Sequence, residues 1–235
     1  MAKSIKRKRM TRHELKEDRF LETAKNLITF FRANTSRIIL TVVILLGIAI
    51  AVRVYLSNRR SAEEIARVKK LYADAFYNNG NFREAVSAYQ EIITLHGGTR
   101  SAKVSTLFLA NCYFFSGDMD NALEYYERSL RILKKNPNWA SAAEMGIASV
   151  HEQKGLFDEA NEYYNNVINN YKNTPVRIDA LLSKARCLEF TNRYTEAITA
   201  YSVIEREYPN TDFANEANKR IVFLRGATES ERIPK

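Results

Sequence analysis

The sequence predicts an all-α protein in which four helix pairs stack into a solenoid that a C-terminal capping helix closes. Alanine recurs in two series, each stepping by 37, 38 and 37 residues: Ala73, Ala110, Ala148, Ala185, and twelve residues later Ala85, Ala122, Ala160, Ala197. A turn-forming residue separates the two alanines of each pair, and a tyrosine follows the second by four residues. These are Gly80, Gly117, Gly155 and Asn192, and Tyr89, Tyr126, Tyr164 and Tyr201. Such a period marks stacked helical units.

The first 37 residues predict a basic tail with a short amphipathic helix. They contain eleven Lys or Arg and four Asp or Glu, which gives a net charge of +7. The first of the basic residues are Lys3, Lys6 and Arg7. Thr11 and Glu14 form a capping box, and apolar residues from Leu15 to Phe31 then recur at helical spacing. This helix either rests on a membrane surface or packs against a partner. The basic start indicates a topology signal, although contact with anionic lipid or ribosomal RNA is an alternative.

Residues 38–56 predict a transmembrane helix. The nineteen residues from Ile38 to Leu56 include one charge, Arg53, near the end where it can reach the head groups. A cleaved signal peptide is the alternative, because Ala49-Ile50-Ala51 resembles a cleavage site. The long preceding segment and the apolar residues that follow favour an uncleaved signal-anchor. Because the whole tail is basic, we expect a cytoplasmic N-terminus and a repeat domain outside the membrane.

A linker is predicted at residues 57–62, and the repeat domain at residues 63–226. In each repeat the alanines let two antiparallel helices approach closely, and the tyrosine packs over their contact. The acidic pair Glu63-Glu64 is expected at the start of a helix, where the dipole favours negative charge. Ala217, Ile221, Phe223 and Leu224 predict the capping helix, with an end at Gly226 and a flexible terminus at 227–235.

Composition gives no support to an enzyme or to a nucleic-acid-binding domain. The net charge of residues 57–235 is only +1, so the excess positive charge belongs to the tail. No phosphate-binding loop, metal-ligand spacing or catalytic triad is present, and the histidines His13, His96 and His151 lie in unrelated positions. Cys112 and Cys187 occupy equivalent positions two repeats apart, which predicts small buried side chains without a disulfide. We therefore expect no catalytic residue, metal, cofactor or small-molecule substrate.

The repeat pattern resembles the tetratricopeptide repeat. Leu109-Ala110, Tyr113, Gly117, Ala122 and Tyr126 carry the resemblance in the best copy, and Pro209 ends the last copy. The early tryptophan of the consensus is replaced by Lys69, Thr106, Glu144 and Leu181. The period also exceeds the usual length of about 34 residues.

This resemblance implies a protein-binding groove lined by the first helix of each pair. The implied groove residues are Lys70, Asp74, Asn78, Asn111, Phe114, Phe115, Met145, Ser149, Gln153, Arg186, Glu189 and Phe190. Lys70 and Asn111 match the carboxylate clamp of the family, but Asp74 stands where an asparagine belongs, which disfavours an anionic peptide terminus. The phenylalanines either bind an apolar or helical ligand or pack between repeats.

The layout of a short tail, one span and a repeat domain resembles a bacterial membrane family that includes the ancillary subunit of the SecYEG translocon. Phe30-Phe31-Arg32-Ala33-Asn34, the span, and Ser61-Ala62-Glu63-Glu64-Ile65 carry that resemblance. It implies an adaptor in the bacterial inner membrane with a periplasmic repeat domain, whose partners are the translocon and chaperones. The sequence Tyr208–Ala214 also resembles periplasmic repeat proteins of outer-membrane assembly and of cell-division coordination. A scaffold in one of those complexes is the alternative.

Overall fold

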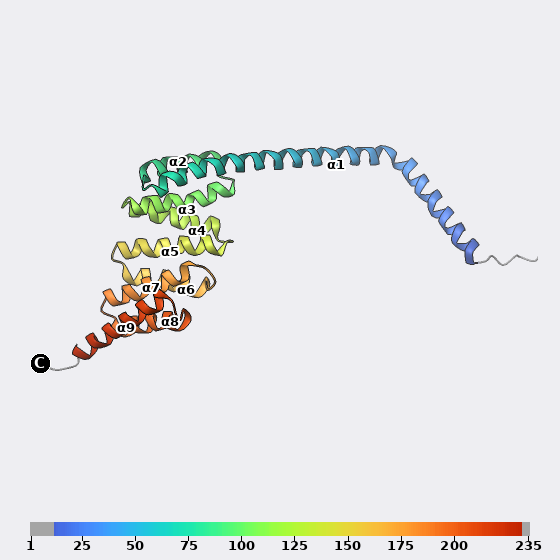
Figure 1. Cartoon of the computed structure of the whole chain (residues 1–235). Coiled ribbons are helices and arrows are strands. Elements are labelled where there is room, and N and C mark those ends of the chain that lie inside the picture. Colours follow the sequence, from blue (N-terminus) through green and yellow to red (C-terminus); the bar gives the residue numbers. More distant parts are fainter. Residues whose placement is uncertain (1–11, 232–235) are drawn as a thin grey trace, which may run out of the picture. The chain divides into compact units, whose positions relative to one another are not determined.

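The computed structural model describes residues 12–231, and these residues form helices and turns without a strand (Figure 1). The helices are α1 Arg12–Asn78, α2 Phe82–His96, α3 Arg100–Phe115, α4 Met119–Leu133, α5 Pro137–Gln153, α6 Phe157–Asn170, α7 Val176–Phe190, α8 Tyr194–Glu207 and α9 Asp212–Glu231. The chain divides into two units between Asn58 and Arg59. The predicted all-α solenoid is confirmed.

The first unit contains most of α1. This helix is interrupted at Asn34, whose backbone is non-helical and whose side-chain amide donates to the carbonyl oxygen of Phe30 at 3.0 Å. Asparagine disfavours a helix interior because its side chain competes for backbone hydrogen bonds. The break separates the predicted amphipathic segment from the predicted span. Thr11 and the basic residues before it lie outside the described residues.

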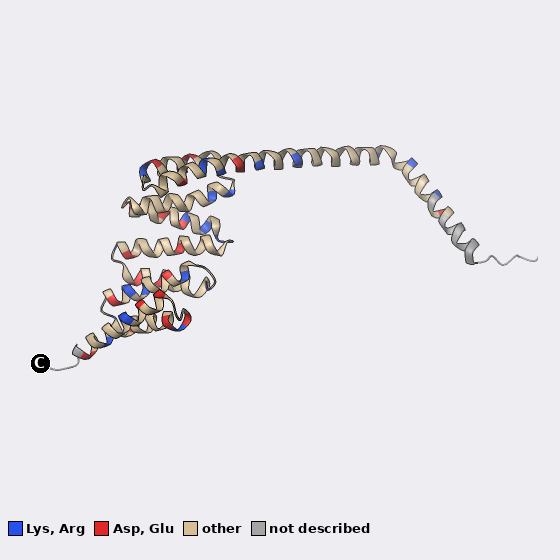
Figure 2. Cartoon of the chain, viewed as in Figure 1, with Lys and Arg blue, Asp and Glu red and all other residues tan. Residues whose placement is uncertain are grey.

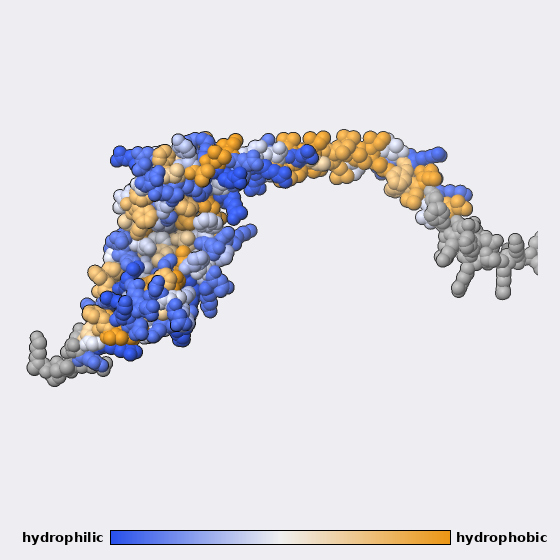
Figure 3. All heavy atoms as spheres, viewed as in Figure 1, coloured by the Kyte–Doolittle hydropathy of each residue, from blue (hydrophilic) through white to orange (hydrophobic). Residues whose placement is uncertain are grey.

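The apolar segment 38–56 is fully helical, and among the described residues α1 is the one helix long and apolar enough to cross a membrane. Its large side chains are exposed in the isolated chain, as the orange atoms along α1 show (Figure 3). Arg53 is the one charged residue in this stretch, which is otherwise tan in Figure 2. An exposed apolar surface of this size marks a site of interaction with lipid or with another protein.

Two helix boundaries differ from the sequence prediction. Helix α1 continues through residues 57–62, because that stretch contains neither proline nor glycine. Helix α9 continues past Gly226 to Glu231. No atom lies within 4 Å of the place where a Cβ of Gly226 would stand, and a single glycine costs a helix only about 1 kcal/mol.

The second unit contains the four helix pairs, formed by the end of α1 with α2, α3 with α4, α5 with α6, and α7 with α8. All eight repeat alanines are fully buried, as expected at close helix crossings. The four turn residues Gly80, Gly117, Gly155 and Asn192 have positive φ values between 59° and 82°. Glycine and asparagine adopt this conformation at low cost, so these residues end the first helix of each pair.

First helices of successive pairs also contact one another, α3 with α5 and α5 with α7. They therefore form one continuous layer, which is the layer that the predicted groove requires. Helix α9 packs on α8 through Ala217, Ile221 and Leu224, which join the core of the last pairs. Phe223 was expected in this contact, but it is exposed, because it follows the buried Ile221 by only two positions.

The sequence predicted Glu63 at the start of its own helix, but the structure places it elsewhere. It lies inside α1, and its carboxylate accepts hydrogen bonds from the backbone N–H groups of Arg100 and Ser101, at 2.6 and 3.0 Å, and from the Ser101 hydroxyl at 2.7 Å. These groups form the N-terminus of α3, where unpaired N–H groups favour an anion. Burial raises the pKa of Glu63, but these hydrogen bonds outweigh it and lower the pKa below its ordinary value. Glu63 therefore links the first pair to the second.

Candidate protein-binding groove

Each helix pair contains one buried tyrosine whose hydroxyl donates a hydrogen bond to the first helix of the same pair. Tyr89 donates to Asp74 at 2.6 Å and Tyr126 to Asn111 at 2.7 Å. The two remaining bonds run from Tyr164 to Glu152 and from Tyr201 to Glu189, the latter at 3.2 Å. Burial raises the pKa of all four tyrosines, so each hydroxyl remains a donor at neutral pH.

Three of the predicted groove residues, Asp74, Asn111 and Glu189, therefore have a structural contact in addition to any role with a ligand. Glu152 makes the same contact in the third pair, although the repeat phase predicted its neighbours Ser149 and Gln153 instead. The signal was present in the sequence: Glu152 follows Ala148 by four positions, as Glu189 follows Ala185.

The predicted clamp residues of the first pair bind each other. The ammonium group of Lys70 contacts both carboxylate oxygens of Asp74 at 2.8 Å and lies 4.3 Å from the centre of the Phe108 ring. Both side chains are mostly buried. A partner carboxylate would have to displace Asp74 from Lys70, so this end of the groove is not preorganised for an anion.

The aromatic residues near the first turns pack mainly on each other. Phe115 is exposed, but it stacks on Phe82 at 5.3 Å and lies 6.3 Å from Tyr77. Phe114 is half-buried and packs against the core of the second pair. Asn78 is exposed at the end of α1. For Phe114 the packing alternative of the sequence analysis therefore describes the side chain best.

In the third pair, the predicted residues are half-buried or exposed. Met145 packs at the edge of the core, and the Ser149 hydroxyl donates to the Met145 carbonyl oxygen at 3.0 Å. Gln153 is exposed at the end of α5. This part of the groove offers polar surface with few large side chains.

The structure brings Arg186, Glu189 and Phe190 together in a cleft of about 520 Å³ between α7 and α9. We call it the C-terminal cleft. Residues that line it also include Asn192, Tyr194, Arg220, Phe223, Leu224 and Ala227. Phe190 is 73% exposed and Phe223 is 62% exposed, so two large rings face solvent at this site.

The charges of the C-terminal cleft are partly paired. Arg220 of α9 donates to the Glu189 carboxylate, and its guanidinium lies 5.4 Å from the centre of the Phe223 ring. Arg186 is exposed and donates to the Ser183 hydroxyl at 2.9 Å. The cleft thus combines apolar rings with an accessible cation, which suits a peptide segment that carries an apolar and an acidic side chain. Arg220 and Phe223 belong to the capping helix, so a motif confined to first helices could not identify them.

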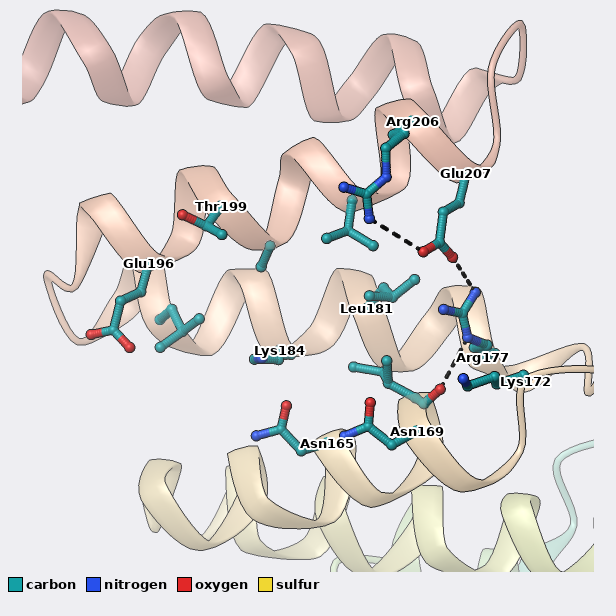
Figure 4. A pocket seen from close by; sticks show the side chains of 14 residues that line it. Asn165, Asn169, Lys172, Arg177, Leu181, Lys184, Glu196, Thr199, Arg206 and Glu207 are labelled. Carbon is teal, nitrogen blue, oxygen red and sulfur yellow. Dashed lines mark hydrogen bonds and ion pairs between the residues drawn. The ribbon is translucent and has the colours of Figure 1, made fainter.

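A second hollow of about 490 Å³ lies between α6 and α8, over α7 (Figure 4). Arg177 closes one end, where it donates to Glu207 at 2.5 Å, to the Tyr208 hydroxyl at 3.1 Å and to the Ile168 carbonyl oxygen at 3.1 Å. Lys184 lies in the middle of this hollow, and burial lowers the pKa of its ammonium group. The walls of this hollow combine the ion pairs of Glu207 with Arg177 and Arg206, apolar side chains, and the polar side chains of Asn165, Asn169 and Thr199.

The described residues contain no cluster of three or more His, Cys, Asp or Glu that could hold a metal ion. Cys112 and Cys187 are free and buried, and burial raises the pKa of each thiol to about 12. Such thiols are poor nucleophiles at neutral pH. His151 stacks on the Tyr163 ring, with 5.3 Å between the ring centres.

Comparisons with known proteins agree with this architecture. Curated relatives are the outer membrane protein assembly factors BamD of Neisseria gonorrhoeae and Neisseria meningitidis, each 26% identical over 163 residues. These matches cover 67% of this chain and 52% of the relatives, so the chain spans about half the length of the curated relatives it matches.

Solved structures show the same fold at low identity. A tetratricopeptide repeat protein from Parabacteroides merdae has a TM-score of 0.57 and 16% identity, over 70% of this chain and 61% of that one. MamA AMB-1 has a TM-score of 0.51 and 17% identity, over 71% of this chain and 84% of that one. The tetratricopeptide repeat profile matches residues 64–135, 101–173 and 145–211, which together span more than half of the chain. The chain therefore belongs to the tetratricopeptide repeat family.

Proposed function

We propose that this chain is a membrane-anchored adaptor that binds a protein partner in the C-terminal cleft. The repeat fold supports a role in protein–protein interaction. The observation that carries the proposal is the pair of exposed rings, Phe190 and Phe223, beside Arg186. Aromatic and arginine side chains dominate the binding energy of protein interfaces, and here they gather at one hollow.

The apolar segment 38–56 is proposed to anchor the chain in the bacterial inner membrane. Its length fits a hydrocarbon core of about 30 Å, and the basic tail before it favours a cytoplasmic N-terminus. The repeat domain would then lie in the periplasm. Thiol labelling of Ser57→Cys in intact cells and in lysed cells tests this orientation, because only a periplasmic thiol reacts with an impermeant reagent in intact cells.

Two complexes are candidates for the partner, and each rests on a different observation. The likeness to BamD favours a complex that assembles outer-membrane proteins. The order of tail, span and repeats favours a role beside the translocon, in which emerging chains pass to periplasmic chaperones. Neither role requires catalysis, a cofactor, nucleic acid or a small-molecule substrate.

Site-specific photocrosslinking tests the cleft and separates these complexes. A photoreactive phenylalanine replaces Phe190 or Phe223 in the full chain, and it replaces Phe213 as the control. Phe213 is an exposed aromatic residue on the same helix α9, but it does not line the cleft. We expect adducts with a subunit of one assembly or translocation complex from Phe190 and Phe223 but not from Phe213. Equal adducts at all three positions, or none, would contradict the proposal.

The affinity for the captured partner then measures the contribution of the Phe190 ring to binding. Because truncation of an interface hot spot costs about 2 kcal/mol or more, Phe190→Ala is expected to weaken binding of the captured partner about 30-fold. Phe213→Ala should leave the affinity unchanged. Circular dichroism of both variants checks that helicity is retained, which we expect because both side chains are exposed.

A further inference from the structure

The outer face of the first helix pair presents large apolar side chains to solvent. Ile65, Val68, Leu71 and Tyr72 of α1 are between 51% and 72% exposed. Their spacing of three and four residues places them on one side of the helix. All four lie in the unit that begins at Arg59.

The repeat period shows what this face does elsewhere in the solenoid. The equivalent residues are Ala102, Ser105, Phe108 and Leu109 in α3, and Ala140, Ala143, Gly146 and Ile147 in α5. All of these are buried except Phe108, which is partly buried.

The second helix of the preceding pair covers these positions. The Tyr89 ring lies 5.9 Å from the Phe108 ring, and a Cβ at Gly146 would stand 2.2 Å from the Tyr126 ring. In α1 the same face has no cover within the described part of the chain. It is therefore a helix-docking face without an occupant.

The side chains on this face differ from those inside the solenoid in a way that points to the occupant. Inside, the first two positions of the face hold alanine or serine, which allow close stacking of unlike helices, whereas α1 has Ile65 and Val68 there. On α1 the line Ser61, Ile65, Val68, Tyr72 and Ala75 has intervals of four, three, four and three residues. Its three middle positions, Ile65, Val68 and Tyr72, are large and apolar. Residues at these intervals form the seam of a coiled coil, in which like helices pack side by side.

We propose that a second copy of this chain packs in parallel on this face of α1. The charges beside the seam are complementary in that arrangement. In a parallel coiled coil, the residue just before the seam residue Ile65 lies opposite the residue five positions later in the other copy. Glu64 of one copy therefore faces Lys69 of the other. Lys69 already contacts Glu91 of its own chain at 2.6 Å, but its side chain is 39% exposed and can bridge both carboxylates.

The parallel direction rests on the proposed membrane anchor, whereas the contact itself does not. Only nine positions separate Leu56 from Ile65, a reach of at most about 30 Å, so copies inserted in the same direction hold their faces near the same membrane surface. Gly47 and Ala51, four residues apart in the apolar segment, provide a small-residue pair that favours contact between transmembrane helices. No atom lies within 4 Å of the place where a Cβ of Gly47 would stand, so this surface of the helix is open.

Disulfide crosslinking of the full chain in lipid vesicles tests the contact and its direction. Ile65→Cys, Val68→Cys and Tyr72→Cys are compared with Arg67→Cys, an exposed position on another side of the same helix. The native thiols are buried and do not interfere. We expect each of the three variants to form a homodimer several-fold faster than Arg67→Cys.

Crosslinks at position 68 without those at 65 and 72 would indicate an antiparallel contact and overturn the parallel proposal. Equal rates at all four positions would indicate random collision and overturn it as well. Quenching of a fluorophore at position 68 by brominated lipid tails, without crosslinks, would assign the face to the bilayer and overturn it too.

A matched pair of variants measures the energetics. Val68→Glu places a carboxylate in the seam and should raise the dimer dissociation constant about 100-fold. Val222→Glu is the control, because Val222 of α9 is exposed to the same extent as Val68. Sedimentation in detergent reads the mass, and circular dichroism checks the fold. A full chain that is monomeric before substitution, or an equal loss for both variants, overturns the contact, whereas failure of membrane insertion alone affects only the anchor.

Discussion

The two ends of the repeat domain are built differently. At the C-terminal end, α9 covers the last pair and buries Ala217, Ile221 and Leu224. At the N-terminal end, the outer face of α1 exposes Leu71 and three further apolar side chains. Helix α9 also exposes Val222 and Phe223, but it covers the last pair, whereas no helix of the described residues covers the outer face of α1.

This difference shows how a repeat protein separates stability from assembly. In a solenoid each pair contacts only its neighbours, so an end without a cap loses one interface but leaves the others intact. A closed end adds stability within the chain. An open end keeps apolar area available for another molecule, and in this chain the open end follows directly on the proposed anchor.

The largest effect that the comparison predicts concerns two leucines. Leu224 of α9 is 1% exposed and Leu71 of α1 is 71% exposed. Leu224→Ala should lower the free energy of unfolding by about 3 kcal/mol, because it removes buried methyl groups and leaves a cavity. Leu71→Ala should change it by less than about 0.5 kcal/mol in the monomer. Urea denaturation of both variants in detergent measures this contrast, and equal losses would show that the first face is covered within one chain.

A smaller effect is expected at the hydrogen-bonded carboxylate of the open end. Glu63→Gln removes the anion from the N-terminus of α3 and should cost about 1 kcal/mol at pH 7. The folded-state pKa of Glu63 is lowered from 4.5, so its stabilisation is complete above pH 4.5 and disappears as the pH falls through the lower folded value. The variant should therefore differ from the wild type at pH 7 but approach it in acid.

Thermal unfolding between pH 3 and pH 7 checks this prediction. Glu162→Gln is the control, since Glu162 is an exposed glutamate of α6 that lies outside the proposed dimer face. A loss for Glu63→Gln that does not depend on pH would mean that geometry rather than charge links the first two pairs.

The sequence predicted the parts of the fold that depend on local spacing. Buried alanines, turn residues with positive φ and the covering helix α9 follow from periodicity and backbone sterics. Contacts between distant residues did not follow from it, because Glu63 reaches α3 and Arg220 reaches α7 across gaps of more than thirty positions. The same limit applies to the groove. Arg186, Glu189 and Phe190 were identified by phase, but Phe223 depends on how α9 lies on α7.

The smallest effect concerns the ion pair that joins α9 to α7. Arg220→Met removes the contact with Glu189 but keeps most of the aliphatic stem over the cleft. Because the Arg220 side chain is 42% exposed, solvent screens the pair, and the expected loss is about 0.5 kcal/mol. Glu189 also keeps the hydrogen bond from Tyr201, so its buried carboxylate is not left without a partner.

Arg225→Met, at an exposed arginine of the same helix, is the control and should have no measurable effect on the free energy of unfolding. A double-mutant cycle with Glu189→Gln isolates the pair, and a coupling energy above about 2 kcal/mol would show that the closed end depends on charge as well as on apolar burial.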